Sequence, residues 1–305
     1  MSTAIGGRQP VRYQAAVADS ARWDDFAFRA DDIVISTPPK CGTTWTQMVC
    51  ALLLFGGSDF PDDLGRMSPW LDSTMQDHDA VLATLREQRH RRFIKSHTPL
   101  DGLPFDERVT YVCVGRDPRD VGLSWGNHMA NIDRAAHPVA TAVGGGMPEQ
   151  PASEVERFRG WVRDDGPVTD GPRSLRSTLH HLATFWDARE RDNIVLLHYD
   201  EMQADLPAAM RRLAAQLGIT VDEAALPRLA EAATFDRMRD QADRFVPEAD
   251  LRIWQNNRDF FRRGSSGYWR DVLDADDRAA YRARVAELVD DDLSAWLHRP
   301  HPLDE

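Results

Sequence analysis

Residues 33–47, IVISTPPKCGTTWTQ, lead a β-branched apolar run through a short turn into a helix-like pattern. The run is typical of a buried strand in a parallel sheet, and the turn contains Lys40 and Gly42. Because glycine allows close backbone approach and the first N–H groups of a helix have no partner within it, such a turn predicts an anion-binding site. An ordinary βα turn capped by a threonine is the alternative. Lysine is also rare: of the 37 lysines and arginines, two are lysine, Lys40 and Lys95.

The composition indicates a globular protein whose anion site must be local. The chain has 305 residues, 42% of them hydrophobic, which suffices for one large α/β domain or two ordinary ones. Its formal net charge of −12 argues against a general nucleic-acid binder, which would have a broad basic surface. The fold itself must therefore gather the cations of an anion site.

The cysteines and the apolar runs bear on the compartment. Cys41, Cys50 and Cys113 form no CxxC or Cys/His ligand spacing, so we expect no disulfide framework, no bound metal and a reducing compartment. The N-terminus lacks the basic and apolar regions of a secretory signal, and the longest apolar run, residues 48–55, is too short to cross a membrane. These features predict a cytoplasmic protein without a transmembrane segment.

Strand-like and helix-like patterns alternate along the chain. Short β-type runs occupy residues 32–36, 92–95, 109–114 and 194–198, and helix-like patterns occupy residues 44–55, 175–191, 206–217 and 274–297. This alternation predicts a three-layer α/β fold, P-loop-like, in which a central parallel sheet is flanked by helices.

The domain organisation predicted is a single domain over residues 1–305. The segment from about residue 133 to residue 172 is rich in glycine and proline and breaks the alternation, so we expect an irregular inserted loop there, of the kind that forms lids. No linker divides the chain.

Each predicted strand is followed by a polar residue near its carboxyl end. These residues are Lys40, His97, Arg116 and Tyr199. In open α/β sheets ligands bind in the crevice outside the carboxyl ends of the strands, so we expect the four side chains to surround one site. The site is no Walker A loop, because GxxxxGK[ST] has no match and the lysine precedes the glycine.

Four motifs together resemble the cytosolic sulfotransferase family, in a bacterial, actinobacterial-like form. TPPKCGTTW (residues 37–45) is similar to the family's 5′-phosphosulfate loop, TYPKSGTTW, and FIKSHTPL (residues 93–100) to its Lys-Thr-His-Leu-Pro strand. YVCVGRDPRDVGLSW (residues 111–125) resembles its 3′-phosphate segment, and FFRRGSSGYW (residues 260–269) its Arg-Lys-Gly-x-x-Gly-Asp-Trp motif. The match extends over roughly residues 33–270.

The resemblance implies transfer of a sulfuryl group from 3′-phosphoadenosine 5′-phosphosulfate (PAPS) to a hydroxyl or amine, with no metal. His97 would be the general base, and its ordinary pKa near 6.5 suits that role. Lys40 would stabilise the charge that develops on the oxygen between sulfur and the 5′-phosphate, since a compact ammonium suits a single oxygen. Lys95 lies in the same motif as His97 and is the third residue assigned to catalysis.

The resemblance also implies a set of donor-binding residues. The 5′ loop comprises Lys40, Cys41, Gly42, Thr43, Thr44 and Trp45. The 3′-phosphate, with its charge of about −1.5 to −2, would need several cationic donors. Those assigned to it are Arg116, Ser124, Arg262, Arg263 and the Gly264 backbone. Adenine would stack on Trp45, Tyr199 and Phe235, because base–aromatic stacking contributes about 1–3 kcal/mol per ring.

The chain departs from the family pattern at several positions. Cys41 replaces a serine, Arg263 a lysine and Tyr268 an aspartate, and Ala233 stands where many relatives have a threonine. The family's dimer motif has no match after Arg270, so the oligomeric state stays open.

The resemblance places the segment with Trp70 and Met75, and the glycine- and proline-rich insertion, where the family builds its acceptor wall and lid, and their apolar character indicates an apolar acceptor pocket. We therefore expect a small hydrophobic alcohol or phenol as acceptor, with lipid-like molecules among the candidates. Two other functions remain open: a nucleotide kinase or NTPase with a variant phosphate loop, and a nucleotide-binding module without catalysis.

Overall fold

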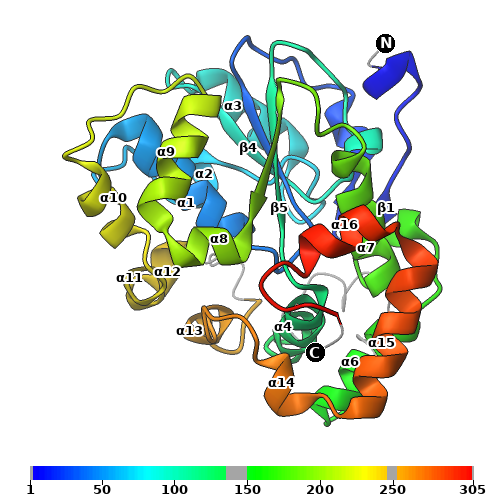
Figure 1. Cartoon of the computed structure of the whole chain (residues 1–305). Coiled ribbons are helices and arrows are strands. Elements are labelled where there is room, and N and C mark those ends of the chain that lie inside the picture. Colours follow the sequence, from blue (N-terminus) through cyan, green and yellow to red (C-terminus); the bar gives the residue numbers. More distant parts are fainter. Residues whose placement is uncertain (1–2, 135–149, 246–252, 304–305) are drawn as a thin grey trace.

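The computed structural model describes residues 3–134, 150–245 and 253–303. Its centre, seen in Figure 1, is a sheet of parallel strands. The order of the strands is β4-β3-β5-β6. The strands are β3 (Ile33–Ser36), β4 (Phe93–Ser96), β5 (Thr110–Gly115) and β6 (Ile194–His198). All four predicted strands and their parallel arrangement are therefore confirmed, with ends shifted by at most one residue. A separate antiparallel hairpin pairs β1 (Gln14–Ala15) with β2 (Ala18–Asp19).

The strand register aligns the carboxyl ends of the sheet. Ser36 pairs with Ser96 across β3 and β4, and Gly115 pairs with His198 across β5 and β6. The residues that follow these strands therefore emerge at one edge, which is where the sequence predicts the site.

Helices cover both faces of the sheet, which confirms the three-layer prediction. Side chains alternate between the faces along each strand. Ile33, Ile35 and Phe93 pack in one core cluster with helices α1, α9 and α10, whereas Val34 and Ile94 pack in the other with α4, α6, α7, α15 and α16.

The longer helices are α1 (Thr43–Phe55), α3 (His78–Glu87), α4 (Pro118–Ala130), α6 (Glu154–Arg163), α7 (Leu175–Trp186), α9 (Leu206–Gln216), α10 (Leu226–Ala232), α15 (Ala275–Leu288) and α16 (Asp291–Leu297). The shorter ones are α2 (Leu64–Met67), α8 (Tyr199–Ala204), α11 (Phe235–Asp240), α12 (Ala242–Phe245), α13 (Asn257–Phe260) and α14 (Trp269–Val272), with single 3₁₀ turns η1 (Ile5–Gly7), η2 (Ser20–Trp23), η3 (Leu100–Gly102) and η4 (Val168–Asp170).

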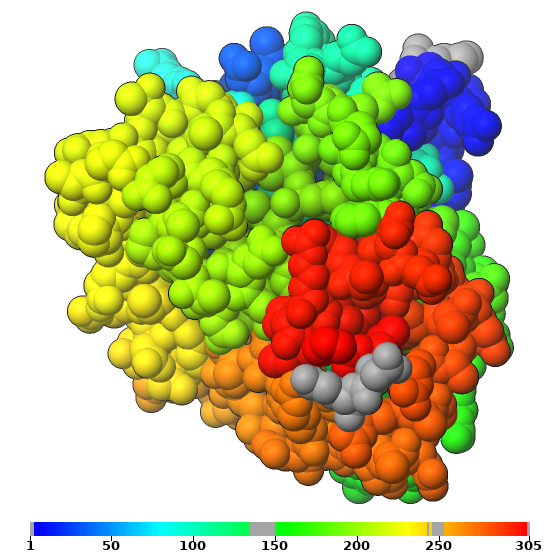
Figure 2. Space-filling view, viewed as in Figure 1, coloured from blue at the N-terminus to red at the C-terminus, as the bar shows by residue number. Residues whose placement is uncertain are grey.

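The C-terminal helices lie against the sheet and its neighbours. Trp296 of α16 is 5.2 Å from Trp186 and 5.4 Å from His198, measured between ring centroids. Figure 2 shows this segment in red, in contact with the green residues of the middle of the chain. Within the described part of the chain, no helix is both long and apolar enough to span a membrane.

Two predictions about helices are corrected by the structure. The helix predicted over residues 274–297 is two helices, because Val289 adopts an extended backbone (φ −143°) and Asp290 caps the start of α16. The helix predicted over residues 175–191 ends at Trp186.

The expectation of an irregular insertion over residues 133–172 is wrong for residues 154–163. This stretch is the amphipathic helix α6, whose Phe158, Trp161 and Val162 are buried, and the side chain of Ser153 caps its start. Residues 135–149 of the predicted insertion lie outside the described residues. The single domain over residues 1–305 remains a prediction.

Candidate active site

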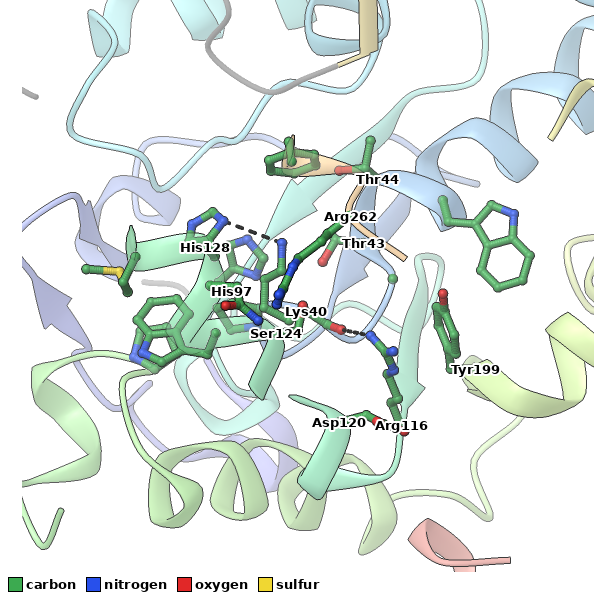
Figure 3. Close-up of a pocket in the computed structure, with 18 of the residues that line it drawn as sticks. Lys40, Thr43, Thr44, His97, Arg116, Asp120, Ser124, His128, Tyr199 and Arg262 are labelled. Carbon is green, nitrogen blue, oxygen red and sulfur yellow. Dashed lines mark hydrogen bonds between the residues drawn. The ribbon is translucent and has the colours of Figure 1, made fainter. Parts of the chain in front are cut away.

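A cavity of about 660 Å³ opens at the carboxyl edge of the sheet. It is lined by residues that follow β3, β4, β5 and β6 (Figure 3). Residues of the segment after α13, which comprises residues 261–268, also line it. The lining includes every site residue predicted from the sequence except Cys41: Lys40, Gly42, Thr43, Thr44, Trp45, Lys95, His97, Arg116, Ser124, Tyr199, Phe235, Arg262, Arg263 and Gly264. The fold thus places these residues around one space, and their individual roles remain predictions.

The turn between β3 and α1 has an unusual backbone. Lys40 has a φ of 70° and Gly42 a φ of 95°, both in the left-handed region. A side chain at position 42 would also lie 3.0 Å from the Tyr199 ring, so glycine is favoured there on two grounds. A non-glycine residue in this conformation is uncommon, and strained backbone of this kind concentrates at functional sites.

Cys41 lies differently from the other loop residues. Its side chain is fully buried in the core cluster that includes Val34 and Cys113 and does not line the cavity. Its N–H donates to the Pro38 carbonyl at 3.3 Å. The structure therefore does not place Cys41 with the residues that face the cavity, although the sequence assigns it to donor binding.

Lys40 reaches into the cavity beside a residue that the sequence prediction missed. Its Nζ lies 3.4 Å from Nδ1 of His128 and 4.5 Å from the ring centre of Phe260. Burial, followed by the positive charges of Arg116 and Lys95, lowers the pKa of Lys40 to about 7. His128 follows Ser124 by four residues on α4, and this helical spacing is the signal that could have identified it.

His97 has a defined orientation. Its Nδ1 donates to the Thr37 carbonyl at 2.7 Å, so that Nε2 has a lone pair available as an acceptor. The ring contacts Trp70 edge-on at 5.1 Å, and Nζ of Lys95 lies over the same Trp70 at 4.5 Å. Burial and then the charge of Lys95 lower the pKa of His97 well below its ordinary value, so His97 is neutral at pH 7.

Arg116 connects the two ends of the site. It donates from Nη1 to the Lys40 carbonyl at 3.0 Å and from Nη2 to the Ser265 carbonyl at 3.1 Å. Its guanidinium lies 4.2 Å from the ring centre of Tyr199. Its Nε is buried and has no partner among the described residues. An anion that binds here would therefore contact a guanidinium that is already held in place by the Lys40 and Ser265 carbonyls.

The aromatic residues predicted for adenine form part of the cavity wall. Trp45 donates from Nε1 to the Ala233 carbonyl at 2.9 Å and meets Tyr199 edge-on at 5.1 Å. Gly264 has a φ of 64°, and an added Cβ would lie 2.2 Å from Phe235. Phe235 thus packs directly on the glycine backbone.

Acidic residues around the segment after α13 were also missed by the sequence analysis. Asp120 of α4 is buried and accepts the Gly267 N–H at 2.7 Å, and burial raises the pKa of its carboxyl group. Glu154 of α6 pairs with Arg262 at 2.9 Å. Asp120 lies within the motif of residues 111–125, but its contact with Gly267 and the contact of Glu154 with Arg262 each join residues more than 100 positions apart, so the sequence has no signal for them.

Comparisons with known proteins agree with this geometry. A sulfotransferase domain model matches residues 30–292. A glycolipid sulfotransferase of Mycobacterium bovis is 40% identical, with 94% of each chain covered. One of Mycobacterium tuberculosis is also 40% identical, again with 94% of each chain covered.

The fold is likewise similar to that of solved sulfotransferases. A mouse sulfotransferase in complex with PAP superimposes with a TM-score of 0.71 at 18% identity, covering 92% of this chain and 93% of the other. The match of the domain model and of the mycobacterial relatives extends over most of the chain. The chain therefore belongs to the sulfotransferase family of enzymes.

Proposed function

We propose that the protein transfers the sulfuryl group of PAPS to a hydroxyl, or secondarily an amine, of a glycolipid-like acceptor. The observation that supports this most directly is the approach of Lys40 and His97 to the same cavity from two different strand ends. The mycobacterial relatives are described as glycolipid sulfotransferases. The mouse neighbour is in complex with PAP (adenosine 3′,5′-bisphosphate), the nucleotide that remains after sulfuryl transfer from PAPS.

The residues of the cavity fit an anionic donor. Lys40, Arg116, Arg262 and Arg263 all line it, although the chain as a whole has a net charge of −12. The unpartnered, buried Nε of Arg116 is the kind of group that a bound phosphate satisfies. The free N–H groups at the start of α1 add further donors.

His97 is oriented to accept a proton. In the proposed reaction Nε2 takes the proton of the acceptor hydroxyl, the hydroxyl oxygen bonds to sulfur, and the bond from sulfur to the 5′-phosphate oxygen breaks in line. Burial, followed by the charge of Lys95, lowers the pKa of His97 and makes it a weak base. Negative charges of a bound donor would oppose that effect and bring the pKa of His97 closer to neutrality.

The acceptor side of the cavity is apolar. Trp70, Met75, Trp125, Ile132 and Trp254 all line the cavity. Such a wall suits the hydrocarbon part of a lipid better than a free sugar, because apolar surface gains most from burying apolar groups. A cytoplasmic location would agree with the three free, buried cysteines.

Transfer of labelled sulfur tests the function. Wild type incubated with ³⁵S-labelled PAPS and a glycolipid fraction should label a lipid, and His97→Ala should lower the rate by at least about 100-fold, which is the usual contribution of a general base. His90→Ala is the matched control, because His90 is a histidine outside the cavity lining. Equal labelling by wild type and His97→Ala would exclude His97 as the base. Magnesium-dependent turnover of ATP without sulfuryl transfer would favour a kinase instead.

A further inference from the structure

We propose that Glu154 and Tyr268 are positioning residues that orient Arg262 and Arg263 for the 3′-phosphate of the donor. Helix α6 would thereby contribute to nucleotide recognition. The inference rests on the proposed function, because it requires a donor with a 3′-phosphate.

The carboxylate of Glu154 receives three donors from two other segments. Nη1 of Arg262 lies 2.9 Å from Oε1, and the hydroxyl of Tyr268 donates to Oε2 at 3.0 Å. Nδ2 of Asn127, on α4, donates to Oε1 at 2.5 Å. A single side chain therefore joins the start of α6, helix α4 and the segment that contains both arginines.

Tyr268 holds the second arginine. The guanidinium carbon of Arg263 lies 3.4 Å from the centre of the Tyr268 ring, a close cation–π contact. Burial and the hydrogen bond to Glu154 raise the pKa of Tyr268, so the hydroxyl keeps its proton at neutral pH and remains a donor. One tyrosine thus contacts Arg263 with its ring and Glu154 with its hydroxyl.

Stability alone does not account for this cluster. The side chain of Arg262 is 42% exposed, and ion pairs of exposed side chains contribute little to folding. An arginine with five N–H donors can hold a carboxylate with one of them and a phosphate with others. Because the side chain has many rotamers in solution, prior orientation by Glu154 reduces the entropy lost when a phosphate binds.

The same contacts explain a departure from the family pattern. An aspartate at position 268, as in the cytosolic sulfotransferase motif, has no ring on which Arg263 could lie and would place a second carboxylate near Glu154. The tyrosine instead provides a neutral donor to that carboxylate. Tyr268 and Glu154 therefore work as a pair in this chain.

The test compares two nucleotides that differ only in the 3′-phosphate. Binding of adenosine 3′,5′-bisphosphate and of adenosine 5′-phosphate is measured by calorimetry for wild type, Glu154→Ala and Tyr268→Leu. We expect each variant to bind the bisphosphate about threefold to tenfold more weakly and to bind the monophosphate within about twofold of wild type. Glu156→Ala is the control, since Glu156 is exposed on the first turn of the same helix.

A second pair of measurements separates positioning from folding. Tyr268→Phe keeps the ring and loses the hydroxyl, so it should lose preference for the bisphosphate by a smaller factor than Tyr268→Leu. Melting temperatures report any general destabilisation, which would weaken both nucleotides alike.

The outcomes distinguish a failure of this inference from a failure of the proposed function. If wild type binds both nucleotides equally, the proposal of a donor with a 3′-phosphate and the inference about Glu154 and Tyr268 are both wrong. A wild type that prefers the bisphosphate, with variants that retain this preference, would overturn the inference alone. Tighter binding of the bisphosphate by Glu154→Ala would also overturn it, because the carboxylate would then compete with the phosphate.

Discussion

Lys40 occupies a position where charge type should matter more than charge alone. In the proposed reaction its compact ammonium meets one oxygen at the breaking bond, whereas the planar guanidinium of an arginine suits several oxygens of a phosphate. We expect Lys40→Arg to lower turnover by about 100-fold or more while the affinity for PAP changes by about threefold at most. Single-turnover rates and calorimetric affinities provide the two numbers. Equal losses in both would mean that Lys40 is merely a phosphate ligand.

The lowered pKa of Lys40 predicts uptake of a proton when the donor binds. Burial and the charges of Arg116 and Lys95 lower this pKa to about 7, and His97 and His128 lie beside the amine. Bound phosphates favour the ammonium form, so PAP should raise this pKa. Affinity for PAP should therefore be highest below pH 7 and fall as the pH rises above it.

Calorimetry in buffers of different ionisation enthalpy measures this proton directly. Wild type at pH 8 should take up a fraction of a proton on binding PAP, and Lys40→Met should take up less. Identical uptake by both proteins would assign the proton to another group.

At the scale of single elements, the segment after α13 depends on a glycine that contacts Phe235. Gly264 and Gly218 have almost the same φ, 64° and 65°, but an added Cβ meets Phe235 at 2.2 Å in the first case and nothing within 4 Å in the second. Both alanine variants should lose about 1 kcal/mol of stability from the left-handed backbone. Only Gly264→Ala should also weaken PAP binding, by about tenfold, because Phe235 and the adjacent arginines must shift. Thermal unfolding and PAP titration check both effects, and unchanged affinity in Gly264→Ala would show that the segment adapts.

Elements with a strong local pattern could be predicted from the sequence, and contacts between distant segments could not. Strands β3, β5 and β6 are nearly continuous apolar runs, and helix α1 lies between Gly42 and Gly56, so the positions of these elements could be predicted. Helix α6 was hidden by the glycine and proline around it, although its buried Phe158, Trp161 and Val162 have helical spacing.

The site residues divide in the same way, into those within a local motif and those placed by contacts between distant segments. Residues within motifs, such as Lys40 and His97, were placed at the cavity from their positions after strands. Glu154 and Asp120 depend on contacts across more than 100 residues of chain, for which a single sequence has no signal. Cys41 belongs to the loop motif, but the direction of its side chain was fixed by packing against the core.

For the whole molecule, buried histidines near the site should make folding sensitive to acid. Burial lowers the pKa of His181 to about 3, and that of His97 is also well below its ordinary value. Between pH 6.5 and the folded-state pKa the unfolded chain binds protons that the folded chain does not, so the free energy of unfolding falls as the pH falls.

The size of this loss follows from the shift. For His181 it should reach about 1 kcal/mol at pH 5.5 relative to pH 7.5, and chemical denaturation at the two pH values measures it. His181→Asn retains a polar group near Ser36, its partner at 3.3 Å, and should lose correspondingly less on acidification. An equally steep pH dependence in that variant would show that other groups dominate.

The inward direction of Cys41 has a consequence for the chemistry of the whole protein. If the thiol of Cys41 faced the cavity, it would be accessible to alkylating agents and peroxides, which attack the thiolate. Here Cys41 is fully buried and burial raises its pKa to about 12, while Cys50 and Cys113 are buried as well. The described cysteines should therefore react only when the core opens. Their modification would then report global unfolding of the chain, not occupancy of the cavity beside them.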